Sequence, residues 1–398
     1  MPYIDGIIPM IGQFLYQQQI AILAFICVLF LIAVFNVLTI KSLGSSSQTS
    51  LYPMVSILIP ARNEAQNIEE CVYSVLNQDY SSYEVIVLDD ESQDATPELL
   101  KRLSEGNSKL TVLSGQPLPP GWVGKNWACF QLSQAAQGDL ILFVDADTRH
   151  HPSMLAEAVS TLITMQADLL SGLPRQELIT WGERLILPVL PWAILSFFPI
   201  RLLQHLHFSF LSIAVGQFIL CKRIAYLQIG GHASIRSSVI DDIALARLFK
   251  KNGLKWEFVN LMGRVNCRMY QNFREVIDGL SKNLFAVFGS ILPVLLFIWL
   301  WLAIVFITPA MSFILYIFGV PLPGYSPALA LVTIGISMLL WLTSLWYFRM
   351  PLLQAVVYPL TIALASLLAF RSAWLHFTQH SVSWKGRNVK TSQRRVKL

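Results

Sequence analysis

The stretch LILFVDADTRHHP, residues 140–152, decides how the rest of the chain is interpreted. Its first five residues are apolar and polar residues follow at once, a pattern typical of a buried strand. Because side chains alternate along a strand, Asp145 and Asp147 are predicted to point to the same side. Two hard oxygen ligands at the end of a buried strand suit Mg²⁺ or Mn²⁺ carrying a diphosphate. A simple polar turn is the alternative.

The composition places part of this chain in a membrane. Of its 398 residues, 54% are hydrophobic and 13% are charged, whereas proteins average about 25% charged residues. The net charge of +5 is modest for this length, and no nucleic-acid partner is expected. The five cysteines form no C-x-x-C pair, which argues against a zinc ribbon or a redox pair and favours a reducing compartment for the soluble part.

Apolar segments long enough to cross a membrane lie near both ends of the chain. Residues 1–19 form a mixed N-terminal segment without the positive start of a secretory signal. Residues 20–40 form the first predicted transmembrane helix, and residues 291–370 contain about three more. A basic tail, residues 384–398, follows them.

Two further segments are predicted to lie at the membrane surface. Residues 271–288 repeat apolar side chains every three to four positions, with charged ones between them. Residues 185–215 are apolar but interrupted by prolines, so an interfacial or re-entrant segment is predicted, with a pair of buried core helices as the alternative.

The distribution of Lys and Arg predicts the topology of this multi-pass protein of the cell membrane. The soluble block is rich in both residues near its membrane ends, so a cytoplasmic location is predicted for it. Three crossings after the block put the basic tail outside, against the same rule. The side of the tail therefore stays open.

Between the apolar segments, residues 54–270 alternate strand-like and helix-like patterns. Strands are predicted at 54–60, 84–90, 110–113 and 140–144. Helical spacing, caps and Pro or Gly breakers fill the intervals. Such alternation predicts an α/β fold with a parallel sheet, whose site lies at the carboxyl ends of the strands.

Four motifs occur in order along this block: VSILIPARNE at 55–64, VLDDESQDAT at 87–96, FVDADT at 143–148 and IDD at 240–242. Together they resemble the family 2 glycosyltransferases, which implies a GT-A (nucleotide-diphospho-sugar transferase) fold with flanking transmembrane helices. The plan of one span before and about three after resembles the lipid-modifying branch, namely ceramide glucosyltransferases and the bacterial hopanoid- and carotenoid-associated enzymes. PLPPGWVGKNWAC at 117–129 also resembles that branch.

The resemblance implies a set of donor-binding residues. The nucleotide-sugar is expected to contact Pro60, Ala61, Asn63, Glu64, Asp89 and Asp90 after the first two strands, and Lys125 and Asp145 further along. Ordinary strand-end turns and a surface lysine are the alternatives. Glu91 stands where the commoner D-D-G-S pattern has glycine, so a different local turn is expected. Asp145 and Asp147 carry over as the D-x-D pair that binds Mg²⁺ or Mn²⁺.

Asp241 and Asp242 match the acidic pair that supplies the general base in the family. An inverting transfer needs a base to take the proton of the attacking hydroxyl, and the alignment favours Asp242. The alternative is that both acids only stabilise the N-terminus of a helix. His150 and His151 are close to the metal pair in sequence, but they are predicted to be solvated loop residues.

The stretch YQNFRE, residues 270–275, departs from the Q-x-x-R-W motif of processive polysaccharide synthases. Gln271 and Arg274 are kept, but Glu275 replaces the tryptophan that supports a growing sugar chain in those enzymes, which favours a single transfer. Arg274 is expected to reach the diphosphate, with a membrane-surface arginine as the alternative.

These features predict a membrane-bound inverting glycosyltransferase that moves one sugar to a hydroxyl of a lipid acceptor, such as a carotenoid, a hopanoid or another glycolipid precursor. A UDP-sugar is the expected donor, and sugars carried by guanine or thymine nucleotides are the alternatives. A processive polysaccharide synthase and a polyprenyl-phosphate glycosyltransferase are the enzymatic alternatives. A membrane scaffold with an inactive domain is the non-enzymatic one.

Overall fold

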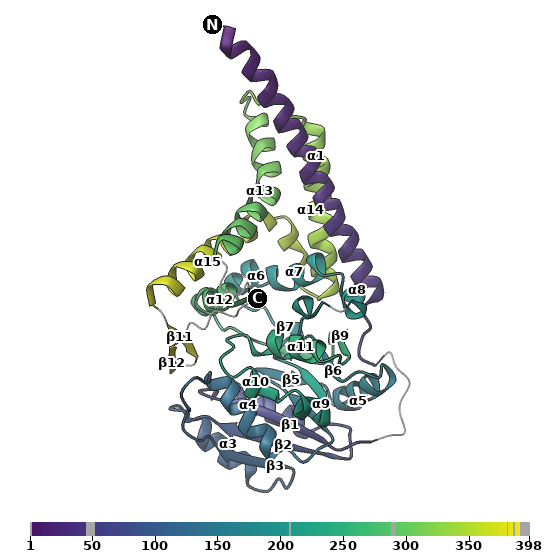
Figure 1. Cartoon of the computed structure of the whole chain (residues 1–398), viewed down its shortest axis with the longest axis vertical. Coiled ribbons are helices and arrows are strands. Elements are labelled where there is room, and N and C mark those ends of the chain that lie inside the picture. Colours follow the sequence, from purple (N-terminus) through teal and green to yellow (C-terminus); the bar gives the residue numbers. More distant parts are fainter. Residues whose placement is uncertain are drawn as a thin grey trace. The chain divides into compact units, whose positions relative to one another are not determined.

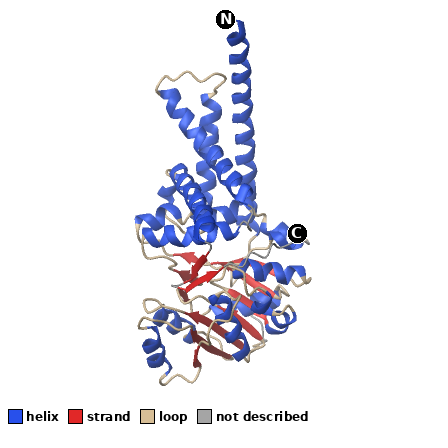
Figure 2. Cartoon of the chain, turned by 60° about the vertical axis from the view of Figure 1, so that its left-hand side comes forward, coloured by secondary structure: helices blue, strands red, loops and turns tan. Residues whose placement is uncertain are grey.

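The computed structural model describes residues 2–44, 52–206, 208–287, 292–379, 381–384 and 387–390. The chain divides into two compact units (Figure 1). The helical unit comprises Met1–Thr39, Leu178–Pro199 and Tyr270–Leu375, and the sheet unit comprises Ile40–Glu177, Ile200–Met269 and His376–Leu398. All strands of the described residues belong to the sheet unit, where they can be followed in Figure 2.

The sheet unit is built on a seven-stranded sheet with the order β3-β2-β1-β4-β8-β6-β9. Its strands are β1 (Val55–Ala61), β2 (Tyr83–Asp89), β3 (Leu110–Ser114), β4 (Leu140–Phe143), β6 (Leu169–Leu173), β8 (Ile219–Lys222) and β9 (Trp256–Asn260). The pairings are parallel except those of β8 with β4 and β6. The interior strand β1 is buried along its whole length, as its continuous apolar sequence predicts. The predicted α/β fold is therefore confirmed, and β8 makes the sheet mixed.

A small sheet and several helices complete the sheet unit. The small sheet has the order β5 (Thr148–His150), β10 (Val265–Cys267), β7 (Arg175–Gln176), and a separate pair is formed by β11 (Ser381–Trp384) and β12 (Arg387–Lys390). The helices are α2 (Ile68–Leu76), α3 (Thr96–Ser104), α4 (Gly124–Ala135), α5 (Met154–Thr164), α8 (Ile200–His205), η1 (Ser209–Leu211), α9 (Arg223–Gln228), α10 (Gly231–Ser234) and α11 (Asp241–Lys251). α11 has acids in its first turn and lysines in its last, which complements the helix dipole.

The helical unit contains the four described helices that are long and apolar enough to cross a membrane. Its elements are α1 (Pro2–Thr39), α6 (Trp181–Ile186), α7 (Val189–Phe197), α12 (Phe273–Val287), α13 (Leu292–Ile317), α14 (Pro327–Tyr347), η2 (Leu352–Ala355) and α15 (Tyr358–Gln379). The N-terminal segment 1–19 is not separate, because α1 continues through it without a break. The segment 185–215 forms short helices that are interrupted at Pro188 and Pro199. The basic tail 384–398 falls mostly outside the described residues.

Glu275, which replaces the tryptophan of the processive synthases, caps the start of α12. The Glu275 amide donates to Asn272 Oδ1 at 3.0 Å, and its carboxylate accepts from the Gln271 amide at 2.8 Å. This reciprocal pattern is close to a capping box, which satisfies amide groups that the first helical turn leaves unpaired. The glutamate thus has a structural role at the position where the processive enzymes carry an aromatic ring.

Candidate active site

The loops that follow β1 and β2 are tied together by hydrogen bonds of 2.8–3.1 Å. The amides of Asn63, Glu64 and Ala65 donate to Ser92 Oγ, Thr96 Oγ1 and Asp94 Oδ2, and the Gln93 amide donates to Asn63 Oδ1. Because β1 and β2 are parallel neighbours, their carboxyl ends bring both loops to one edge of the sheet. The predicted donor-binding residues of these two motifs therefore lie close together.

Asp90 is fully buried beneath this edge. Its amide donates to the carbonyl of Ala61 at 2.8 Å, and its carbonyl accepts from the guanidinium of Arg62. Arg62 is itself buried and also donates to the carbonyl of Glu91 at 2.9 Å. Arg62 was not among the predicted site residues, because an arginine after a strand gives no sign that it will turn inward. Pro60 is buried in β1, and its contact with a nucleotide stays a prediction.

Glu91 adopts a φ of +55°, in the left-handed region that favours glycine. The turn after Asp90 therefore keeps a backbone conformation that glycine adopts readily. The expectation of a turn that differs from that of the D-D-G-S pattern stays a prediction. Such a conformation costs a residue with a Cβ about 1–2 kcal/mol.

Asp145 and Asp147 lie on the turn between β4 and β5. The prediction that a continuing strand aligns them was wrong, because β4 ends at Phe143. The two carboxylates are nevertheless neighbours: burial, then Asp145, then Glu64 raise the pKa of Asp147 to about 7. Asp147 Oδ1 is buried and has no hydrogen-bond partner among the described residues.

Lys125 connects the metal pair with the acids of α11. Its Nζ lies 2.8 Å from Asp145 Oδ1 and 3.6 Å from Asp241 Oδ2. Burial lowers the pKa of Lys125, but Asp145 and Asp241 raise it more, and the net pKa is well above its ordinary value. The neighbouring Asn126 fixes the start of α4, because its Nδ2 donates at 2.9 Å to the carbonyls of Ile235 and Ser238, just before α11.

Asp242 is held at the N-terminus of α11 by backbone amides. Its Oδ2 accepts from the Gly216 amide at 2.9 Å, and its Oδ1 accepts from the Ile243 amide at 2.7 Å. Burial, followed by the charge of Asp241, raises the pKa of Asp242 to about 7. A Cβ at Gly216 would lie 3.1 Å from Lys125 Nζ, so glycine leaves room for the ammonium. Sequence reasoning missed Gly216, which belongs to none of the four motifs.

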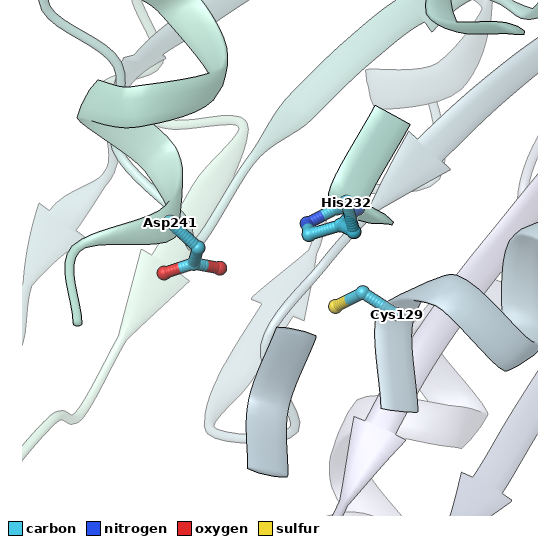
Figure 3. A group of neighbouring side chains, drawn as sticks. All are labelled: Cys129, His232 and Asp241. Carbon is cyan, nitrogen blue, oxygen red and sulfur yellow. The ribbon is translucent and has the colours of Figure 1, made fainter. Parts of the chain in front are cut away.

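Cys129, His232 and Asp241 lie close together (Figure 3), with candidate ligand atoms within 4.8 Å of one another. Sulfur and nitrogen donors suit Zn²⁺ better than Mg²⁺. However, burial and the charge of Asp241 raise the pKa of the Cys129 thiol well above its usual range, which disfavours the thiolate that binds metal. The Lys125 ammonium already offsets the charge of Asp241. We therefore interpret this group as a polar lining behind Lys125.

The carboxylates of Asp145 and Asp147 fit a divalent cation better. Both offer hard oxygen ligands, and the buried Asp147 Oδ1 lacks a partner within the described part of the chain. The raised pKa of Asp147 reflects negative charge gathered in a poorly solvated place, which a cation would relieve. The residues present therefore fit the predicted Mg²⁺ or Mn²⁺.

Three further residues that the sequence singled out have different surroundings in the structure. His150 is buried in β5, where Nε2 lies 2.8 Å from Thr148 Oγ1 and burial lowers its pKa to about 3, so the expectation of a solvated side chain was wrong. His151 is exposed, as expected. Arg274 lies on α12 of the helical unit, where its side chain is 92% exposed and 3.9 Å from Asp278, and its contact with a diphosphate stays a prediction.

Comparisons with known sequences agree with the motif order. Residues 56–229 match the family model described as glycosyl transferase family 2. Glycosyltransferase AglE of Haloferax volcanii is 36% identical over 31% of this chain and 40% of its own length. The 4,4'-diaponeurosporenoate glycosyltransferases of Staphylococcus haemolyticus and Staphylococcus aureus (strain USA300) are 26% and 28% identical, over 62% of this chain and 66% and 65% of their lengths. The match thus spans less than two thirds of each relative.

A solved structure supports the fold. Mannosyltransferase PcManGT from Pyrobaculum calidifontis, in complex with GDP-Man and Mn²⁺, matches with a TM-score of 0.55 at 17% identity, over 94% of this chain and 99% of that one. At this identity the likeness concerns the fold alone. Residues 56–229 therefore form a family 2 glycosyltransferase domain, and the chain has the GT-A fold with candidate membrane-spanning helices on both sides of that domain.

Proposed function

We propose that this protein is a membrane-bound inverting glycosyltransferase that moves one sugar from a nucleotide-sugar to a hydroxyl of a lipid acceptor. The observation that carries the proposal is Asp242, whose carboxylate is partly buried, held by two backbone amides and shifted to a pKa of about 7. A base is most effective when its pKa is near the working pH. Lys125 contacts both Asp145 and Asp241, the neighbour of Asp242, so the proposed base and the donor-binding residues share one site.

The residues of the site have separate roles in this proposal. Asp89 accepts hydrogen bonds from the nucleoside, the buried Asp90 supports the turn beneath it, and Lys125 pairs with the diphosphate. Asp145 and Asp147 would hold Mg²⁺ or Mn²⁺, which neutralises charge on the departing diphosphate. Asp242 takes the proton of the acceptor hydroxyl, whose oxygen bonds to the anomeric carbon from the face opposite the diphosphate. That geometry inverts the configuration of the sugar.

A lipid acceptor is supported by the helical unit and by the relatives. Four described helices are long and apolar enough to cross a membrane, which a transferase acting on soluble acceptors does not need. Two relatives are named for diaponeurosporenoate, a carotenoid acid. A carboxylate acceptor is ionised at neutral pH and needs no base, so the setting of Asp242 favours a hydroxyl. The domain is proposed to lie on the cytoplasmic side, where nucleotide-sugars are made.

The donor is proposed to be a UDP-sugar, with a GDP-sugar as the second candidate because PcManGT was solved with GDP-Man. The capping role of Glu275 disfavours a processive synthase, which needs an aromatic ring at that position. A polyprenyl-phosphate acceptor would require no strong base. An inactive scaffold would have no need for a partly buried carboxylate that is held by two amides.

The test is sugar transfer in membranes that contain the full-length protein, with a panel of labelled UDP- and GDP-sugars and extraction into organic solvent. Membranes that lack the protein are the control. Label that enters the lipid phase as a product resistant to mild acid supports a glycosylated hydroxyl. Label found only in insoluble polymer, only in acid-labile sugar phosphates, or nowhere would overturn the proposal in favour of the synthase, the polyprenyl-phosphate enzyme or the scaffold, respectively.

A further inference from the structure

We propose that α15 lies along the membrane surface instead of crossing it, so that the basic tail and the glycosyltransferase domain share one side of the membrane. Among the four candidate spans in the described residues, α15 is the least apolar and has the largest buried share. In this arrangement α15 contacts the lipid headgroups on the same side of the membrane as the domain. The inference uses contacts within the helical unit and does not depend on the catalytic proposal.

α15 contacts other elements of the helical unit at three levels along its length. Thr361 Oγ1 donates to the carbonyl of Leu185 in α6 at 2.8 Å. Ser366 Oγ donates to the carbonyl of Trp299 in α13 at 3.3 Å. The guanidinium of Arg371 reaches α12, where it lies 3.0 Å from Asp278 Oδ1 and 2.7 Å from Ser281 Oγ.

The helices α6 and α12 belong to the same side of the membrane as the domain. α6 begins at Trp181 and α12 begins at Phe273, shortly after the sheet unit's segments end at Glu177 and Met269, so no crossing separates either helix from the domain. The two helices also pack together, with the rings of Trp181 and Phe273 stacked at 5.2 Å. Gly182 permits this approach, because a Cβ there would lie 2.6 Å from the Phe273 ring. The two helices therefore lie at the same depth relative to the membrane.

A helix that crosses the membrane cannot stay at the depth of α6 and α12 along its whole length. Thr361 and Arg371 are about 15 Å apart along α15, half the roughly 30 Å thickness of the hydrocarbon core. If α15 crossed from the level of α6, Arg371 would lie deep in hydrocarbon, where a charged group is costly. Instead Arg371 pairs with Asp278, which belongs to the same amphipathic helix as the polar Ser281. Both ends of this interval are therefore at the surface.

The exposed side chains of α15 fit a helix that rests on lipid. Its large exposed apolar residues fall on one face, at Leu360, Leu367, Phe370 and Trp374. The turn before it exposes Leu352, Leu353 and Val356, which suit insertion among the headgroups. α1, α13 and α14 then cross the membrane. The six Lys and Arg residues of the tail reach the domain's side, which removes the conflict with the positive-inside rule.

The test is labelling of introduced cysteines in the full-length protein by an impermeant maleimide, before and after membranes are made permeable. Thr391→Cys reports on the tail, Lys101→Cys on the domain and Pro321→Cys on the loop between α13 and α14. The wild type is the control, since four of its five cysteines are buried. We expect Thr391→Cys to behave like Lys101→Cys and opposite to Pro321→Cys, whichever side the domain occupies.

Labelling of Thr391→Cys in common with Pro321→Cys would overturn the proposal. A reporter fused after Leu398 gives an independent reading: a fluorescent protein folds in the cytoplasm and alkaline phosphatase becomes active outside it. The fusion must report the same side as Lys101→Cys. Because neither readout requires sugar transfer, failure here is distinguishable from failure of the catalytic proposal.

Discussion

The two acidic pairs of the site share one cation, yet their second members are held differently. Asp145 and Asp241 both lie next to Lys125. Burial and neighbouring charges raise the pKa values of Asp147 and Asp242 to about 7. Both oxygens of Asp242 accept backbone amides, while Asp147 Oδ1 has no partner in the described chain. A fixed carboxylate suits a base, and a carboxylate with an unpaired oxygen suits a metal ligand. Two carboxylates with similarly raised pKa values are thus proposed to have two different functions.

The largest expected effect comes from Asp242→Asn, which keeps the shape but removes the base. Transfer should fall about 10²–10⁴-fold, because no group takes the proton of the acceptor. Donor affinity, measured by calorimetry, should stay near that of the wild type. Asp79→Asn, an exposed change in the same unit, is the control. Transfer at the wild-type rate would remove the distinction between the two pairs.

Asp147→Asn should act on the metal instead. Loss of one ligand should weaken Mn²⁺-dependent nucleotide binding about 10–100-fold or more, with a smaller effect on binding without metal. Chelation of divalent ions should reproduce this loss in the wild type, and added Mn²⁺ should reverse it. Nucleotide affinity that ignores both the variant and the chelator would show that Asp147 is not a ligand.

Lys125→Met tests the cation that the two pairs share. A hydrogen bond to a charged group contributes about 1.5–3 kcal/mol, so KM for the nucleotide-sugar should rise about 10–100-fold. Methionine keeps the aliphatic stem, and Lys101→Met on the surface of α3 serves as the matched control. An unchanged KM would mean that Lys125 only neutralises Asp145 and Asp241.

The pH dependence should follow Asp242. The raised pKa means that this carboxylate is protonated below about pH 7, and a protonated base cannot act. With saturating Mn²⁺ to keep Asp147 ionised, kcat should fall about tenfold per pH unit below 7 and level off above it. The charged groups that act on Asp242 are Asp241 and Lys125. A rate that is flat down to pH 5 would contradict the assignment.

The smallest effect is expected from Glu91→Gly, which lies outside both pairs. Glycine relieves the left-handed conformation but increases the freedom of the unfolded chain, so a net stabilisation of about 0.5 kcal/mol is expected. Thermal unfolding in detergent measures it. Glu105→Gly is the matched control, since Glu105 has a φ of −68° and should only lose stability. Equal losses in both variants would show that Glu91 is not strained.

The sequence was informative wherever a local pattern decides the structure. Apolar runs located the first four strands, and the motif order indicated the domain and its acids. Contacts between distant segments were not predictable. Gly216 approaches Asp242 only because β8 inserts beside β4. Arg62 turns inward only because it can donate hydrogen bonds to carbonyls of the loop after β2. His150 was misjudged for the same reason, because its burial depends on the packing of β5.

The hydrogen bonds between the loops after β1 and β2 bear on how a donor binds. The loops hold each other through their own side chains before any nucleotide arrives. Binding to a surface that is already ordered loses less conformational entropy than binding to mobile loops. The proposed nucleoside end of the site is therefore preorganised, and more of the free energy of each contact with a donor would remain available as affinity.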